Sequence, residues 1–180
     1  MVKLNLSSQI VLNKVPEEFY HPKTAVELSE LTRCEKLPTT IFPKTEEGAL
    51  SIATTIANAI RQKQQSGQYC VLGLGTGSSL TPVFNELIRL HKEEKLSFSN
   101  VVVFNAYEYF PLQPSAKNST LNQLKERLLN HIDINPQNVF TLEGTVPQER
   151  VQESCRLYEQ RIQSFGGIDI MLLGIGRIGN

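Results

Sequence analysis

Four short apolar runs, separated by amphipathic segments, are the feature that most constrains the fold of this chain. The runs cover residues 69–74, 101–104, 139–142 and 168–173, and none of them alternates strictly between apolar and polar residues. The segments between them, and residues 45–62 before them, carry apolar residues at helical spacing. Strands that are apolar on both faces are typical of a parallel sheet covered by helices. The sequence therefore predicts an α/β fold: a Rossmann-like open parallel sheet with helices on both faces.

The expected helices have recognisable starting residues. Thr45 is expected to cap the helix before the first strand, Thr81 the next helix, and Ser119 the one after the second strand. The last helix is predicted over residues 151–165, with Cys155 on its apolar stripe.

The first 44 residues differ from the rest of the chain. Prolines at positions 16, 22, 38 and 43 interrupt them, and only residues 25–31 carry a short helical pattern. Proline at this density breaks regular structure. We therefore predict an irregular N-terminal arm, residues 1–44, followed by a Rossmann-like domain, residues 45–180.

Composition excludes several classes of protein. The 18 Lys and Arg residues balance the 18 Asp and Glu residues, which argues against a nucleic-acid partner. No apolar run approaches the length of about 18 residues that a membrane helix needs, and the N-terminus does not resemble a signal peptide. The three cysteines have no metal-ligand spacing, so we expect no metal, reduced thiols and a cytoplasmic location.

A glycine-rich loop follows the first apolar run. Gly75, Thr76, Gly77, Ser78 and Ser79 combine glycines that let a ligand approach the backbone, hydroxyl groups, and the start of a helix. Such a loop favours an anion, above all a phosphate. It matches neither the Walker pattern nor the complete GxGxxG dinucleotide pattern. The alternative is a tight turn whose glycines serve only the path of the chain.

Two further loops are expected at the same edge of the sheet, since ligands of such sheets bind at the carboxyl ends of the strands. After the second run, Glu108 is a candidate general base and Tyr107 a candidate donor to a developing oxyanion. A solvated loop with packed aromatic rings is the alternative. After the fourth run, Arg177 is a candidate partner for a substrate phosphate or carboxylate, or else part of an irregular chain end.

Several segments in the same order resemble the glucosamine-6-phosphate deaminase/isomerase family. They read LGTGSSLTP, RLHKEEKLSFSNVVVFNAYEY, NHIDI, RLYEQRI and LLGIGRIG, and the similarity runs from about residue 45 to residue 180. The 6-phosphogluconolactonases are more distant relatives with a similar phosphate loop. The resemblance implies a sugar-phosphate substrate, no cofactor, homo-oligomers, and isomerisation of an amino-sugar phosphate with loss of ammonia. It also assigns residues 75–79 to the phosphate-binding loop.

The catalytic positions of that family are not retained. Tyr107 stands where the family has the Asp that moves the proton between the first two sugar carbons, although the following acid is present as Glu108. In the later Gly-Val-Gly-x-Asp-Gly-His loop, Ile178 replaces the Asp and Asn180 the His that opens the sugar ring. Family members also continue past this loop, so the resemblance implies a domain that is incomplete at its C-terminus.

Three hypotheses follow for the function. The first is a divergent deaminase/isomerase in which Glu108 replaces the missing base. The second is a non-catalytic, regulatory relative that binds a sugar phosphate without converting it. The third is a hydrolase similar to 6-phosphogluconolactonase. The sequence leaves open whether the chain is an enzyme. The family's general base is not retained, and losing a positioned general base typically lowers the rate by ~10²- to 10⁴-fold.

Overall fold

A computed structural model describes residues 23–33 and 37–176 of the chain. The chain divides into two compact units, residues 1–48 and residues 49–180. In the first unit, helix α1 (Ala25–Thr32) begins at a capping box, in which the side chains of Thr24 and Glu27 each accept a hydrogen bond from the other residue's backbone amide. The predicted boundary between arm and domain, at residues 44 and 45, lies close to this division and stays a prediction.

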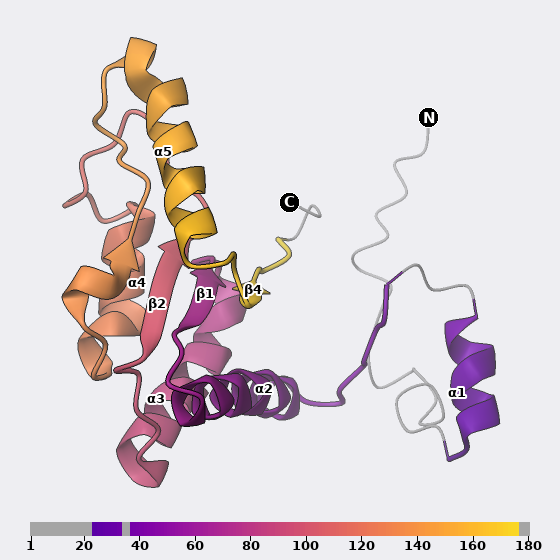
Figure 1. Ribbon diagram of the computed structural model, residues 1–180. Coiled ribbons are helices and arrows are strands. Elements are labelled where there is room, and N and C mark those ends of the chain that lie inside the picture. The colour runs from indigo at the N-terminus through magenta and orange to yellow at the C-terminus, as the bar shows by residue number, and fades with distance from the viewer. Residues whose placement is uncertain (1–22, 34–36, 177–180) are drawn as a thin grey trace, which may run out of the picture. The chain divides into compact units, whose positions relative to one another are not determined.

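Within the described residues, the second unit is built around a four-stranded parallel sheet with the strand order β3-β2-β1-β4 (Figure 1). The central strands are β1 (Cys70–Leu74) and β2 (Val101–Asn105), and every residue of both is buried. The edge strands are the shorter β3 (Val139–Phe140) and β4 (Ile170–Leu172). Central strands buried on both faces confirm the predicted open parallel sheet of the α/β class.

Helices cover both faces of this sheet (Figure 1). On one face, Leu72 and Val103 pack with the apolar sides of three helices, which are α2 (Thr45–Gln65), α3 (Thr81–Glu94) and α4 (Thr120–Arg127). On the other face, Val71 and Phe104 pack against α5 (Val151–Ser164). Alternate residues of each strand therefore enter different cores, as the pleat of a strand requires.

The third strand is shorter than its apolar run predicts. Pairing stops after Phe140, whereas residues 139–142 were expected to be extended. The amide of Leu142 instead donates to the side-chain oxygen of Asn105, at 2.9 Å, where β2 ends. A polar side chain thus replaces the ladder at this end of the sheet, and the chain turns away into the loop that follows.

Three expectations about the helices need correction. Thr45 is the first residue of α2 rather than the residue before it, and Leu80 rather than Thr81 precedes α3. A turn of 3-10 helix, Ser78–Leu80, leads directly into α3, which moves the helical start toward the glycine-rich loop. Cys155 is exposed instead of buried, because α5 packs on the sheet through only a narrow stripe that includes Tyr158 and Ile162. The expected cap at Ser119 is present, since its hydroxyl accepts a hydrogen bond from Asn122.

Candidate functional site

The loop from Gly75 to Ser79 leaves its backbone amides free. The amide of Gly75 donates to the carbonyl of Leu172, at 2.9 Å, and continues the pairing of β1 with β4. The next four amides, of residues 76–79, donate to no acceptor among the described residues. They lie just before α3, where free N–H groups and the helix dipole both favour an anion.

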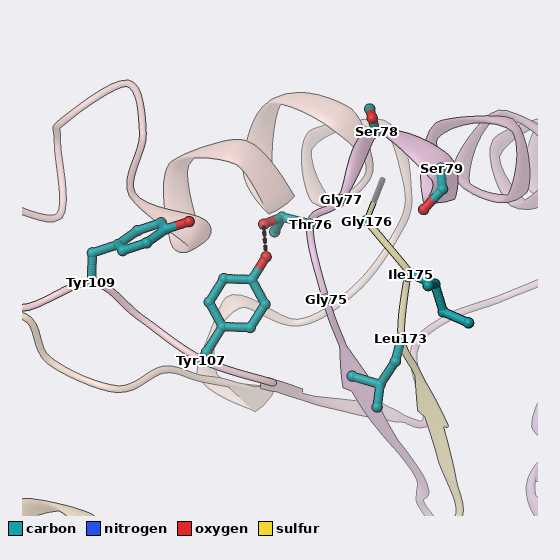
Figure 2. A pocket seen from close by; sticks show the side chains of 11 residues that line it. Gly75, Thr76, Gly77, Ser78, Ser79, Tyr107, Tyr109, Leu173, Ile175 and Gly176 are labelled. Atoms are coloured by element: carbon teal, nitrogen blue, oxygen red, sulfur yellow. Dashed lines mark hydrogen bonds between the residues drawn. The ribbon is translucent and has the colours of Figure 1, made fainter. Parts of the chain in front are cut away.

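A cavity of about 510 Å³ opens in front of these amides (Figure 2). Its walls come from three loops at the carboxyl ends of neighbouring strands, and the lining residues are 75–79, Tyr107, Tyr109 and 173–176. None of these lining residues carries a charged side chain. An anion in this cavity would therefore meet only N–H and O–H donors along the described part of the wall.

The loop after β4 approaches the first loop closely. A Cβ atom on Gly174 would lie 2.5 Å from the Oγ of Ser79 and 3.9 Å from the Cα of Gly77. Only glycine fits this approach without displacing a neighbour. The second glycine-rich segment, which the sequence placed at the same edge of the sheet, therefore forms the opposite wall of the cavity.

Tyr107 and Tyr109 form the aromatic side of the cavity. The hydroxyl of Tyr107 lies 3.2 Å from the hydroxyl of Thr76, and Figure 2 shows the two groups directed at each other. The two tyrosine rings meet edge to face, with their centroids 6.0 Å apart. These phenol groups offer a hydrogen-bonding and stacking surface for a polar ligand such as a sugar.

Glu108 lies outside this cavity, between the two tyrosines in sequence. Its Oε1 accepts hydrogen bonds from the amides of Tyr109 (2.9 Å) and Thr120 (3.0 Å), and its Oε2 from the hydroxyls of Ser119 (2.9 Å) and Thr120 (2.9 Å). Burial disfavours the charge, but these hydrogen bonds, led by the Thr120 amide, outweigh it and hold the pKa of Glu108 below its usual value. The carboxylate therefore serves as an anionic cap at the start of α4.

Two residues that sequence reasoning did not single out organise the site. The buried side chain of Asn105 donates to the carbonyl of Tyr107 (2.9 Å) and accepts from the hydroxyl of Tyr158 (2.8 Å). Arg127, at the end of α4, donates through Nη1 to the carbonyl of Thr76, at 2.7 Å. An asparagine at the end of an apolar strand is a detectable sequence feature, but nothing in the sequence connects Arg127 to a loop fifty-one positions away.

Some expected site residues lie outside the described part of the chain. Arg177, Ile178 and Asn180 all belong to residues 177–180. In the described ranges, 23–33 and 37–176, no three His, Cys, Asp or Glu side chains are grouped as metal ligands. The same residues include no helix that is both long and apolar enough to span a bilayer.

Comparisons with known proteins agree on one family. The sequence model described as glucosamine-6-phosphate isomerases/6-phosphogluconolactonase matches residues 43–179. A glucosamine-6-phosphate deaminase-like protein of Bacteroides thetaiotaomicron is 59% identical over 179 residues, which cover 99% of this chain and 27% of that protein. Glucosamine-6-phosphate deaminase 2 of Giardia intestinalis is 42% identical over 137 residues, which cover 76% of this chain and 50% of the relative. This chain thus spans half or less of the length of these two relatives.

Two solved structures have a fold similar to that of this chain. The structure of a monomeric glucosamine-6-phosphate deaminase superposes with a TM-score of 0.70 at 37% identity, over 76% of this chain and 54% of that one. The 6-phosphogluconolactonase of Thermotoga maritima superposes with a TM-score of 0.53 at 22% identity, over 69% of this chain and 56% of that one. The second likeness concerns the fold alone.

Proposed function

This chain belongs to the glucosamine-6-phosphate isomerase/6-phosphogluconolactonase family, and on that premise we propose that it binds an amino-sugar phosphate in the cavity beside β1. The phosphate group would lie on the amides of residues 76–79 and the sugar against Tyr107 and Tyr109. The observation that carries this proposal is that residues 76–79, whose backbone amides have no acceptor among the described residues, line a cavity of about 510 Å³. That volume lies within the range of about 300–1,000 Å³ usual for small-molecule sites.

Binding without turnover is the form of this proposal that the geometry supports best. Isomerisation of an aldose phosphate needs a base close to the proton on the second sugar carbon. The described residues that line the cavity include no carboxylate and no histidine. At the family's catalytic Asp, this chain presents the phenol of Tyr107, which is held against Thr76.

The enzyme hypothesis makes Glu108 the base, and it requires a rearrangement. The carboxylate would have to leave the amides and hydroxyls at the start of α4, where a lowered pKa makes it a weaker base. The hydrolase hypothesis agrees with the family description, which includes 6-phosphogluconolactonase, but the solved 6-phosphogluconolactonase named above is 22% identical and supports the fold alone. A regulatory, non-catalytic sugar-phosphate binder is therefore our first proposal, and a deaminase/isomerase is the second.

A single amide of the loop provides a sharp test. Ser78 begins a 3-10 turn, and the preceding Gly77 has φ −56° and ψ 149°, a conformation that proline tolerates in the residue before it. Ser78→Pro would remove the amide donor together with the hydroxyl, whereas Ser78→Ala would remove the hydroxyl alone. A hydrogen bond to a charged group contributes roughly 1.5–3 kcal/mol, so Ser78→Pro is expected to weaken binding by about tenfold or more.

The measurements are a thermal-shift titration with glucosamine 6-phosphate and an assay of ammonia release. Unphosphorylated glucosamine is the ligand control, and at a hundred times Kd the phosphorylated ligand should stabilise the chain by about 2.7 kcal/mol. Stabilisation without ammonia, reduced more by Ser78→Pro than by Ser78→Ala, is the expected result. Release of ammonia would favour the enzyme hypothesis, and absence of any shift with the wild-type chain would refute the proposed site.

We also propose that the protein acts in the cytoplasm and assembles from identical copies, as the family resemblance implies. The relative described as a monomeric deaminase indicates that assembly is not general among similar proteins. Light scattering coupled to size-exclusion chromatography tests the oligomeric state, and a mass equal to a single chain would refute that part of the proposal.

A further inference from the structure

We infer that Arg127 is a positioning residue for the glycine-rich loop of residues 75–79, which is called the anion loop below. Through the carbonyl of Thr76, Arg127 orients the amide of Gly77 toward the ligand. It also brings an uncompensated positive charge to the loop. This inference rests on the proposed function, because it assumes that the loop receives a phosphate. Nothing in the family match or in the sequence pattern assigns a role to Arg127.

The first step is the hydrogen bond from Arg127. Its Nη1 lies 2.7 Å from the carbonyl oxygen of Thr76, which is a short, charge-assisted contact. Thr76 is 4% exposed, and its side-chain hydroxyl is held by Tyr107 at 3.2 Å. The carbonyl and the hydroxyl of Thr76 are therefore both held by other elements. Arg127 at the end of α4 holds the carbonyl, and Tyr107 in the loop after β2 holds the hydroxyl.

As the second step, the peptide bond between Thr76 and Gly77 links the direction of the Thr76 carbonyl to that of the Gly77 amide. In a trans peptide the carbonyl and the following N–H point in opposite directions. Arg127 is not among the residues that line the cavity, so the carbonyl of Thr76, which points at Arg127, is turned away from that space. The N–H of Gly77 is then turned toward the cavity. Gly77 has no side chain with which to fix its own backbone, so this orientation depends on contacts from outside the loop.

The third step concerns charge. Arg127 is half-buried, and no carboxylate of the described residues forms an ion pair with it. Its guanidinium instead donates a hydrogen bond to the neutral carbonyl of Thr76, in the glycine-rich loop. A phosphate monoester carries about −1.5 to −2 charges at neutral pH. It would supply the countercharge that the described residues around Arg127 do not provide.

The test uses two substitutions of Arg127 and one control. Arg127→Met removes the charge and the hydrogen bond to Thr76 while keeping a long side chain, and Arg127→Lys keeps the charge but not the planar fork. Lys125→Met removes a positive charge from the same helix at an exposed position with no hydrogen bond or ion pair to a described residue. It controls for general electrostatic effects of α4.

The first measurement is made on the free protein. Backbone ¹⁵N relaxation should show an ordered Gly77 amide, with an order parameter of about 0.85, in the wild-type chain and in Lys125→Met. In Arg127→Met the order parameter should fall toward about 0.6. An unchanged Gly77 amide in Arg127→Met would overturn the inference, and this result does not depend on whether a sugar phosphate binds.

The second measurement is calorimetric titration with glucosamine 6-phosphate and with glucosamine 6-sulfate, which has a similar shape but whose sulfate ester carries a single negative charge. Arg127→Met should bind the phosphate about tenfold more weakly, and its preference for phosphate over sulfate should shrink. Arg127→Lys should keep that preference. If Arg127 had a purely structural role, Arg127→Met would weaken the binding of both ligands equally. That result would overturn the electrostatic part of the inference. If the wild-type chain binds neither ligand while Gly77 still loosens in Arg127→Met, the proposed function fails and the positioning of the loop by Arg127 stands.

Discussion

Replacing Glu108 by glutamine should cost the protein stability whatever the cavity binds. The carboxylate accepts hydrogen bonds from three backbone amides, those of Tyr109, Thr120 and Leu121, and from two hydroxyl groups, at 2.9–3.4 Å. A glutamine would keep one acceptor oxygen and would direct an NH₂ group at one set of these donors. Hydrogen bonds to a charged group contribute about 1.5–3 kcal/mol, and a negative charge at a helix start adds about 0.3–1 kcal/mol. We expect Glu108→Gln to lower the free energy of unfolding by about 2–3 kcal/mol.

The effect should also depend on pH in a defined direction. The pKa of Glu108 is lowered in the folded chain, so its contribution is fully present above the ordinary glutamate pKa of about 4.3 and is lost as the pH falls through the folded-state value. The difference in stability between wild type and Glu108→Gln should therefore be constant from pH 7 to about pH 5 and shrink below pH 4. Asp133 and Asp169 also have lowered pKa values, but they are common to both proteins and cancel in the difference.

Urea denaturation at pH 7, 5 and 3.5 measures this difference directly. At pH 7 the melting temperature should fall as well, by roughly 4–12 °C, since each kcal/mol corresponds to about 2–4 °C for a chain of this size. Glu143→Gln is the matched control, because that exposed carboxylate accepts a hydrogen bond from a single described residue, through the nearby hydroxyl of Thr145. Its cost should stay below about 0.5 kcal/mol. If Glu108→Gln leaves stability unchanged and abolishes ammonia release, Glu108 is the catalytic base and the argument for a cap is refuted.

Three further predictions concern packing around the site. Gly174→Ala should destabilise the chain by about 1–3 kcal/mol and should cost less in a Ser79→Ala background, because the new Cβ would meet the Ser79 hydroxyl at 2.5 Å; equal costs in urea denaturation would contradict this. Tyr158→Phe should lower the free energy of unfolding by about 1–2 kcal/mol, since its hydroxyl donates to the buried asparagine that ends β2; an unchanged urea midpoint would count against it. Peptide mapping after brief alkylation should find Cys155 modified and Cys70 protected, because burial raises the pKa of the Cys70 thiol to about 11; rapid labelling of Cys70 would contradict its burial.

The central part of the fold could be predicted from the sequence because local and global preferences agree there. The runs that became β1 and β2 are almost continuously apolar, which is typical of strands at the centre of a sheet covered on both faces. The edges were predicted less well. An edge strand ends where its backbone no longer pairs with the neighbouring strand. The pairing of β3 with β2 ends at Phe140, and the amide of Leu142 donates to the side chain of Asn105 instead. Asn105 and Leu142 lie far apart along the chain, so this contact could not be predicted from local sequence.

Part of the candidate site could likewise be predicted from the sequence, and part could not. The glycines and hydroxyl residues of the loop after β1 lie next to one another in sequence, so a phosphate-binding role for this loop could be predicted without a structure. The role of Glu108 was not visible, because a carboxylate at the end of a strand can face either a ligand cavity or the start of a helix. The contacts of Glu108 with Ser119 and Thr120 favour the helix.

The sequence by itself determined the class of fold and the family to which the chain is similar, and it predicted where an anion would bind, since all three depend on contiguous residues and on periodicity. Only the tertiary structure decided which groups surround that loop. Arg127 reaches Thr76, and Gly174 reaches Ser79, through folding that brings distant segments to one edge of the sheet. Hydrogen bonds and steric contacts act over a few ångströms of space, whatever the separation of the residues along the chain.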